Sequence, residues 1–295
     1  MKKINVSICV FVFSIALVLF GMKIFADVGN DQGFSYLVVG LDDSNKNTDV
    51  ICILNFSKSQ GKISLFQVPR DTFYLGGGTL NKVNGLYPTF IKSGENSKQA
   101  LKHLRNEISS TLSVDLNGSI SVTTSAFEQI IDSINGIYIC AEEGYSGNDN
   151  KCKKYNGKEA LEFVRTRKDY VTGDLGRLDA HTAFWHALFR AFKNVSVPEL
   201  FFKLKNASGI EYEGAIVDTL MYFANLHLSN SVELDCVRLP GESILLENKI
   251  SYFVINKNKT ISQLSNSFSI NIEKFDAKEK LFDKNSSVTR KIYYS

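Results

Sequence analysis

Between residues 34 and 68 the apolar residues form short runs separated by polar ones, which is typical of β-strands. Residues 34–41 and 50–56 are rich in Val and Ile, and these residues are enriched in strands. Residues 57–62 contain a glycine and predict a turn, and residues 63–68 predict the next strand. We therefore expect a β-hairpin over residues 50–68.

Four later segments repeat apolar residues at the spacing of an α-helix. In residues 97–112, Leu101, Leu104 and Ile108 share one helix face. The other expected helices are 125–134, 157–164 with Asn156 as N-cap, and 179–192. Extended segments are expected at 120–122 and 137–139. Strands that alternate with helices predict an α/β or α+β fold, in which helices flank a mixed central β-sheet.

The N-terminal segment predicts an attachment to the membrane. Residues 4–22 carry no charge and are bordered by lysines at positions 2, 3 and 23. About 20 apolar residues span a bilayer, and the leading lysines predict a cytoplasmic tip at 1–3 with the rest outside the cell. A cleaved signal peptide is the alternative, although its apolar core is usually shorter. We expect a single-pass protein of the cell membrane, with a transmembrane helix at 4–22 and a linker at 23–33.

The net charge bears on the kind of partner, and the cysteine positions bear on disulfide formation. The net charge of +3 is too small to predict a nucleic-acid partner. Cys52 and Cys236 lie in apolar surroundings and predict core positions. Cys140 and Cys152 flank a Gly-, Asn- and Asp-rich loop. Outside the cytoplasm these two cysteines can form a disulfide, but spacing alone leaves that pairing open.

Acidic residues gather where two predicted strands meet. Asp42, Asp43 and Asp49 bracket the polar loop 44–48. Aspartates are common in turns, which is the simpler interpretation. Alternatively, the strand ends aim the carboxylates at a divalent cation, because Mg²⁺ takes one or two protein carboxylates together with phosphate oxygens and water.

Arginines form the second candidate group. Arg70 and Asp71 close the strand at 63–68, and Arg165 and Arg167 follow the helix at 157–164. The ordinary interpretation is a surface ion pair and a solvated basic run. A fixed guanidinium is, however, a good two-pronged ligand for phosphate. Farther along, Asp174 and Arg177 precede the helix at 179–192 and predict a turn residue and a surface charge.

Together these residues give a resemblance to the LytR-CpsA-Psr family of cell-wall enzymes. The resemblance covers about residues 34–256, which leaves 257–295 as a C-terminal extension. The matching segments are Gly40-Leu41-Asp42, Thr48-Asp49-Val50, Val68-Pro69-Arg70-Asp71-Thr72, Asn81-Lys82-Val83-Asn84 followed by Tyr87, Asn156-Gly157-Lys158-Glu159-Ala160-Leu161, Arg165-Thr166-Arg167 and Asp174-Leu175-Gly176-Arg177.

The resemblance implies an extracytoplasmic, Mg²⁺-dependent (or Mn²⁺-dependent) phosphotransferase. Such an enzyme moves a glycopolymer, of the teichoic acid or capsular polysaccharide type, from a polyprenyl-pyrophosphate carrier to peptidoglycan. It further implies that Asp42 and Asp49 bind the metal and act in catalysis, with Asp174 as another catalytic acid. By the same resemblance, Arg70, Arg165, Arg167 and Arg177 bind the pyrophosphate. The lipid needs a long apolar cavity, which the Phe-rich residues 183–189 are candidates to line.

Two positions depart from the family pattern. Where the family usually has Arg-Gln after the position of Arg177, this chain has Ala180 and His181. His181 is still a candidate to hydrogen-bond a phosphate, or is a residue of the helix N-terminus. These departures motivate a second hypothesis, an envelope protein that binds polyprenyl phosphate or wall polymer without turnover. A transcriptional attenuator is a third, which the missing DNA-binding helix-turn-helix pattern disfavours.

Overall fold

The protein is described from a computed structural model. In the part of the chain that it describes, no helix is long and apolar enough to cross a bilayer. The predicted transmembrane segment at 4–22 lies outside the described residues. The structure describes residues 34–44, 47–57, 62–76, 79–140, 152–165, 174–195, 199, 203, 207–214, 233–245 and 250–267.

A mixed β-sheet forms the centre of the fold, as predicted. Its described strands stand in the order β10-β3-β2-β1-β6-β9. The hairpin expected over 50–68 is the antiparallel pair β2–β3, whereas β1–β6 and β3–β10 are parallel pairs. The strands are β1 (Phe34–Leu41), β2 (Thr48–Ser57), β3 (Lys62–Gln67), β6 (Gly118–Val122), β9 (Ile210–Gly214) and β10 (Glu233–Arg238).

One face of the sheet packs against helices α2 (Leu86–Lys92) and α3 (Ser97–Leu112). Successive side chains of a strand point to opposite faces, so Leu37 and Val39 lie on this face together with Ile53 of β2. These residues share a buried core with Leu101, Leu104 and Ile108, the apolar stripe that the sequence predicts for α3. Burial of this stripe is the main reason why α3 forms, because most helical stability in proteins comes from packing.

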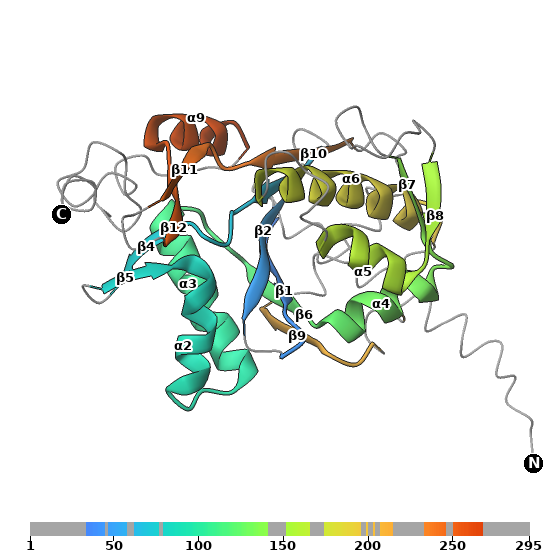
Figure 1. The fold of residues 1–295 in the computed structure, drawn as a ribbon, viewed down its shortest axis with the longest axis horizontal. Coiled ribbons are helices and arrows are strands. Elements are labelled where there is room, and N and C mark those ends of the chain that lie inside the picture. Colours follow the sequence, from blue (N-terminus) through green and yellow to red (C-terminus); the bar gives the residue numbers. More distant parts are fainter. Residues whose placement is uncertain are drawn as a thin grey trace, which may run out of the picture. The chain divides into compact units, whose positions relative to one another are not determined.

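The opposite face is covered by α4 (Thr124–Ser133), α5 (Gly157–Arg165) and α6 (Asp174–Phe192), so that the sheet lies between two helical layers (Figure 1). Asn156 caps α5 as predicted, because its side chain accepts a hydrogen bond from the amide of Glu159 at 2.9 Å. Helix α6 begins at Asp174 rather than at residue 179. The prediction of a turn there was wrong, since Gly176 costs a helix only about 1 kcal/mol.

Smaller elements complete the fold beside α3. They include two hairpins, which lie next to each other because Thr72 bridges to Phe253. Leu264 of the last described helix is completely buried in the main core, so the packed unit continues past the boundary predicted at residue 256. These elements are β4 (Phe73–Gly76), β5 (Thr79–Lys82), the 3-10 turn η1 (Val83–Gly85), β11 (Gly241–Leu245), β12 (Ser251–Ile255) and α9 (Lys257–Ser267).

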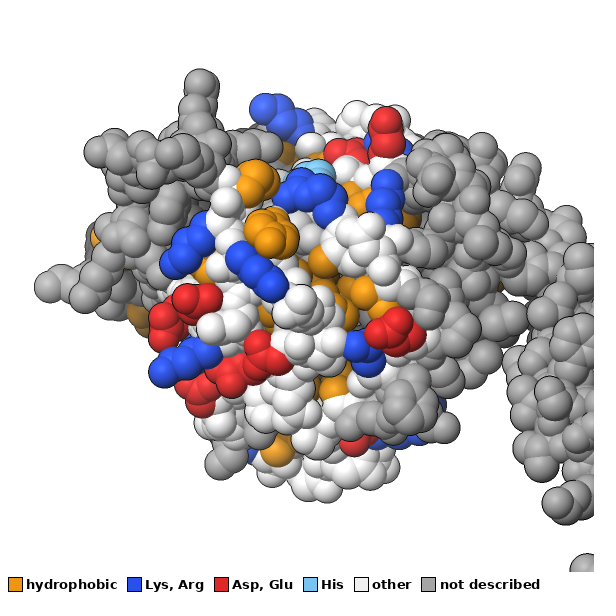
Figure 2. Space-filling model, turned by 90° about the vertical axis from the view of Figure 1, so that its right-hand side faces the viewer, with side chains coloured by type: hydrophobic (Ala, Val, Ile, Leu, Met, Phe, Trp, Pro, Cys, Tyr) orange, Lys and Arg blue, Asp and Glu red, His pale blue; other side chains and the backbone are white. Residues whose placement is uncertain are grey.

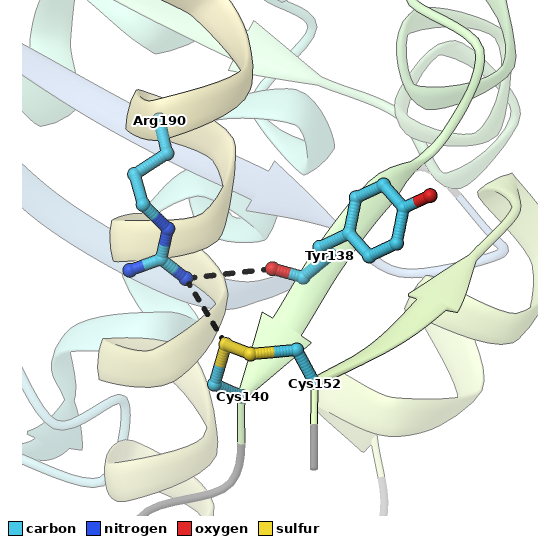
Figure 3. Close-up of a disulfide and its surroundings, with 4 residues drawn as sticks. All are labelled: Tyr138, Cys140, Cys152 and Arg190. Carbon is cyan, nitrogen blue, oxygen red and sulfur yellow. Dashed lines mark hydrogen bonds between the residues drawn. A yellow bond between two sulfur atoms is a disulfide. The ribbon is translucent and has the colours of Figure 1, made fainter.

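A disulfide joins the two strands of a further hairpin, β7 (Ile137–Cys140) and β8 (Cys152–Tyr155). Cys140 and Cys152 stand directly opposite each other, with Cα atoms 4.0 Å apart. Figure 3 shows Arg190 of α6 reaching this hairpin, where its guanidinium donates to the Tyr138 carbonyl at 3.4 Å. The pairing that the sequence left open is therefore present, and it lies against the C-terminal half of α6.

The other two described cysteines are free thiols. Cys52 is buried as predicted, and burial raises the pKa of its thiol. Cys236 is only partly buried, and burial together with the nearby Asp235 carboxylate raises its pKa to about 12. Thiolate is the reactive form of cysteine, so neither side chain is poised for exchange with the Cys140–Cys152 disulfide.

Replacing both Cys140 and Cys152 by Ser is expected to lower the free energy of unfolding by about 2–3 kcal/mol, because the bridge restricts the unfolded chain. Urea titration of the two proteins measures this difference. A reducing agent should weaken the wild type by a similar amount and leave the double variant unchanged. Equal stability of the two proteins would show that the bridge contributes nothing.

Candidate active site

A deep cavity of about 750 Å³ lies between the sheet and helices α4, α5 and α6. Its floor is the sheet face that carries Tyr36, Val38 and Gly40 of β1. It runs along α6 from His181 to Phe192, which is about 16 Å of helix. Phe184, Trp185 and Leu188 of the Phe-rich segment line it. The remaining wall residues are Val39, Leu41, Val50, Leu54, Phe56, Ile120, Val122, Phe127, Ile130, Ile131, Leu161 and Val164.

Polar side chains gather at the His181 end of this otherwise apolar cavity. Asp42, Asp43 and Asp49 line it there, together with Arg165 at the end of α5. Thr123 and Thr124 at the start of α4 belong to the same lining. The cavity thus has a charged mouth and an apolar body. This arrangement suits an amphiphile with a charged head and a hydrocarbon tail.

Asp42 directly follows β1 and organises the loop to β2. Its carboxylate accepts hydrogen bonds from the Ser44 hydroxyl at 2.7 Å and from Asn47 Nδ2 at 2.7 Å. These contacts are those of an aspartate in a turn. The backbone amide of Asn47 also donates to the Asp42 carboxylate, at 3.2 Å, and the carboxylate so held lines the cavity.

Asp49 pairs with Arg70 across the mouth. One carboxylate oxygen of Asp49 lies 2.6 Å from Arg70 Nη1. Within the described part of the chain, Arg70 Nε is buried and makes no hydrogen bond. Buried donors are nearly always satisfied, so this N–H group is an exception among the described residues, although Arg70 itself does not line the cavity.

The turn that carries Arg70 is held rigidly. The Arg70 carbonyl accepts from the amide of Asn84 at 3.2 Å, and the Asp71 carbonyl accepts from the amide of Phe253 at 2.9 Å. The Asp71 carboxylate binds Lys82 at 2.9 Å, not Arg70. The side chain of Arg70 is therefore directed by Asp49 rather than by its neighbour in sequence.

Arg165 forms an ion pair with Asp43 that the sequence did not predict. The guanidinium donates to both carboxylate oxygens of Asp43, at 2.8 and 3.1 Å. This contact, with a further hydrogen bond from the Thr124 side chain, holds the pKa of Asp43 below its usual value. The same pair raises the pKa of Arg165. The acidic doublet at the strand end was the signal available in the sequence, but its partner lies 122 residues away.

His181 is buried in the eighth position of α6 and is not a residue of the helix N-terminus. Its Nε2 lies 3.0 Å from the carbonyl oxygen of Val164. Because a carbonyl only accepts, the ring donates here, and it satisfies one of the free carbonyls at the end of α5. The imidazole therefore fixes the residue next to Arg165. Ala180 is buried in the apolar cluster between α4, α5 and α6.

For the other three predicted site residues, the structure gives at most a position along helix α6. Arg167 lies outside the described residues. Asp174 is the first residue of α6, and Arg177 stands one helical turn before His181. The structure thus brings Asp42, Asp49, Arg165 and His181 to one cavity and joins Arg70 to it through Asp49.

The mouth fits a divalent cation only if the substrate supplies part of its coordination. Among the described residues, no three His, Cys, Asp or Glu side chains gather to hold a metal. Asp42 and Asp49 nevertheless line the same cavity. Mg²⁺ normally binds one or two protein carboxylates and takes phosphate and water oxygens for the rest of its coordination. Two carboxylates at the mouth therefore suit Mg²⁺ bound together with a phosphate, and do not suit a metal that the protein alone coordinates.

On the face shown in Figure 2, the described acidic and basic side chains are interspersed around exposed hydrophobic ones. Nucleic-acid binding domains instead concentrate Lys and Arg on one face.

Comparison with known proteins identifies the family. The model of the LytR_cpsA_psr family matches residues 19–269, and the chain therefore belongs to the LytR-CpsA-Psr family. A relative from Oceanobacillus iheyensis, named polyisoprenyl-teichoic acid–peptidoglycan teichoic acid transferase TagU, is 28% identical over 151 residues, which cover 48% of this chain and 46% of the relative. The chain spans about half the length of the curated relatives it matches.

Solved structures share the fold. The crystal structure of TagV from B. subtilis superposes with a TM-score of 0.64 at 20% identity, covering 84% of this chain and 98% of TagV. A structure titled as TagT bound to LIIa-WTA has a TM-score of 0.65 at 18% identity, covering 81% of this chain and 92% of TagT. The mixed α/β architecture predicted from the sequence is thereby confirmed.

Proposed function

We propose that this protein transfers a glycopolymer from a polyprenyl-pyrophosphate carrier to peptidoglycan at the outer face of the cell membrane. The observation that carries this proposal is the single cavity with a charged mouth and an apolar body. The mouth accommodates the pyrophosphate and the body accommodates the polyprenyl chain. The name of the relatives describes transfer of teichoic acid to peptidoglycan, so a teichoic acid is the first donor to test.

In the proposed reaction, an acceptor hydroxyl of peptidoglycan attacks the phosphorus that carries the glycan. The bond from this phosphorus to the bridging oxygen breaks, and the prenyl phosphate leaves. The hydroxyl proton passes to Asp42, whose carboxylate lines the mouth. The products are a phosphodiester between glycan and peptidoglycan and a prenyl phosphate.

The arginines hold the phosphates during this step. Arg165 lines the mouth, and Arg70 has a buried Nε–H without a hydrogen-bond partner in the described structure. Phosphoryl transfer depends mainly on positioning and on stabilising negative charge. A Mg²⁺ bound by Asp42 and Asp49 would supply further positive charge next to the phosphate oxygens. Asp174, Arg167 and Arg177 are proposed to complete the site, as the family resemblance implies.

A binding protein without turnover is the second candidate. Ala180 is buried among apolar side chains, and His181 donates to a backbone carbonyl. These contacts favour a structural role for both residues, in place of the Arg-Gln that the family usually has at these positions. Such a protein would keep the lipid cavity and lose part of the charge that stabilises the transition state.

One assay separates the two candidates. The membrane-bound protein is incubated with a radiolabelled lipid-linked teichoic acid precursor and peptidoglycan fragments, with Mg²⁺ or with EDTA. The transferase hypothesis predicts label in the peptidoglycan fraction that EDTA abolishes and added Mg²⁺ restores. Donor that binds without any transfer would establish the binding protein, and label transfer unaffected by EDTA would remove the metal from the proposal.

A further inference from the structure

The Asp43 carboxylate lies where an anionic ligand of Arg165 would lie. Both its oxygens accept hydrogen bonds from the Arg165 guanidinium, at 2.8 and 3.1 Å. The Thr124 side chain binds the same carboxylate. Thr124 begins α4, whose N-cap is Thr123, and the N-terminus of a helix also attracts negative charge. Two helices, α4 and α5, therefore combine to hold one carboxylate of the protein itself.

The two arginines described at the mouth are each paired with an aspartate in the absence of any ligand. Among its described residues, Arg165 is neutralised by Asp43, and Arg70 is neutralised by Asp49. Asp49 has a second use, since it is a proposed metal ligand and can release Arg70 when a cation binds. Asp43 has no such use in the proposed reaction. It is a surplus negative charge beside the place proposed for a pyrophosphate.

Asp43 is also easy to displace. Its side chain is 73% exposed, whereas that of Arg165 is 39% exposed. Asp43 lies on the loop between β1 and β2, so its carboxylate is free to turn towards water. Exposed ion pairs contribute little stability, and hydrogen bonds from Arg to phosphate are among the strong ones. A pyrophosphate can therefore replace the carboxylate at Arg165.

We propose that Asp43 is an affinity-determining residue, an internal anion that occupies Arg165 in the empty site and that the donor pyrophosphate must displace. This inference rests on the proposed function and deepens it. Asp43 competes with the donor before binding and repels its phosphates afterwards. Both effects weaken binding, which favours release of the prenyl phosphate product after transfer.

The Asp43→Asn variant tests this competition, because Asn keeps the shape of the side chain and removes its charge. The probes are geranylgeranyl pyrophosphate and inorganic pyrophosphate, titrated calorimetrically with Mg²⁺ present. We expect both to bind about three- to tenfold more tightly to Asp43→Asn than to the wild type. Asp235→Asn is the matched control. Asp235 forms an ion pair with Lys62 at 2.8 Å, and neither residue lines the cavity. The Asp235→Asn protein should bind both probes with the affinity of the wild type.

A double-mutant cycle shows whether the effect acts through Arg165. In an Arg165→Gln background, Asp43→Asn should change affinity less than twofold. The gain should also shrink at 1 M NaCl, which screens charges at an exposed site. If Asp43 had a purely structural role, the effect of Asp43→Asn on affinity would depend neither on Arg165 nor on the salt concentration.

The outcomes separate this inference from the proposed function. Wild-type binding of geranylgeranyl pyrophosphate that Arg165→Gln weakens supports the proposed donor site, whatever Asp43 does. With that result in hand, unchanged or weaker binding by Asp43→Asn would overturn the competition. If neither the wild type nor Asp43→Asn binds either probe, the donor site and the competition are both refuted.

Discussion

The Asp42→Asn protein is expected to lose transferase activity by at least about 100-fold while remaining folded. A carboxylate that takes the proton of the attacking hydroxyl contributes about 10²–10⁴ in rate, and an amide cannot take that proton. The stability change should stay below about 1 kcal/mol, because the loop around Asp42 is exposed. The measurements are label transfer from the lipid-linked donor and urea unfolding of the same preparations.

Asn47→Ala is the matched control for Asp42. It removes the 2.7 Å hydrogen bond between Asn47 Nδ2 and the Asp42 carboxylate but leaves the carboxylate in place. If Asp42 acts chemically, Asn47→Ala should keep most of the activity. If both variants lose activity equally, Asp42 serves only to shape the loop. Asp42→Asn with normal activity would remove Asp42 from the reaction.

The helices that cover the sheet were largely predictable, because each buries one apolar stripe. The residues of α3 at helical spacing, such as Leu101 and Leu104, are the ones that enter the core. The edge strand β9 escaped prediction. Its side chains, including Glu211 and Tyr212, are mostly exposed, so no buried run marks it. Pairing of β10 with β3 likewise depends on segments about 170 residues apart, which a local pattern does not show.

The sequence predicted which residues belong to the candidate site, but it did not predict which of them form ion pairs with one another. The family resemblance led to Asp42, Asp49 and Arg165, and all three line one cavity. That Arg70 is held by Asp49 rather than by Asp71 follows from the sheet, which brings the start of β2 next to the end of β3. The cavity itself has no signature in the sequence, because residues such as Leu188 would look the same in a filled core.

Enlarging Leu188 to Trp is expected to remove the part of the affinity that the far end of a long prenyl chain contributes, while leaving the charged mouth intact. Leu188 lines the cavity about four helical turns after Asp174, where α6 begins. An indole there occupies space that the polyprenyl tail would fill. Each buried CH₂ group contributes about 0.8 kcal/mol, so exclusion of one five-carbon unit weakens binding by roughly several hundredfold. Inorganic pyrophosphate should bind as it does to the wild type.

Phe189→Trp is the matched control, since Phe189 is the next residue of α6 and has no place in the cavity lining. Titration with farnesyl, geranylgeranyl and longer prenyl pyrophosphates measures how affinity depends on chain length. In the wild type and in Phe189→Trp, affinity should rise as each isoprene unit enters the apolar body. In Leu188→Trp the rise should stop at a shorter chain. Parallel length dependence in all three proteins would mean that the prenyl chain binds elsewhere, and the apolar body of the cavity would then lose its proposed ligand.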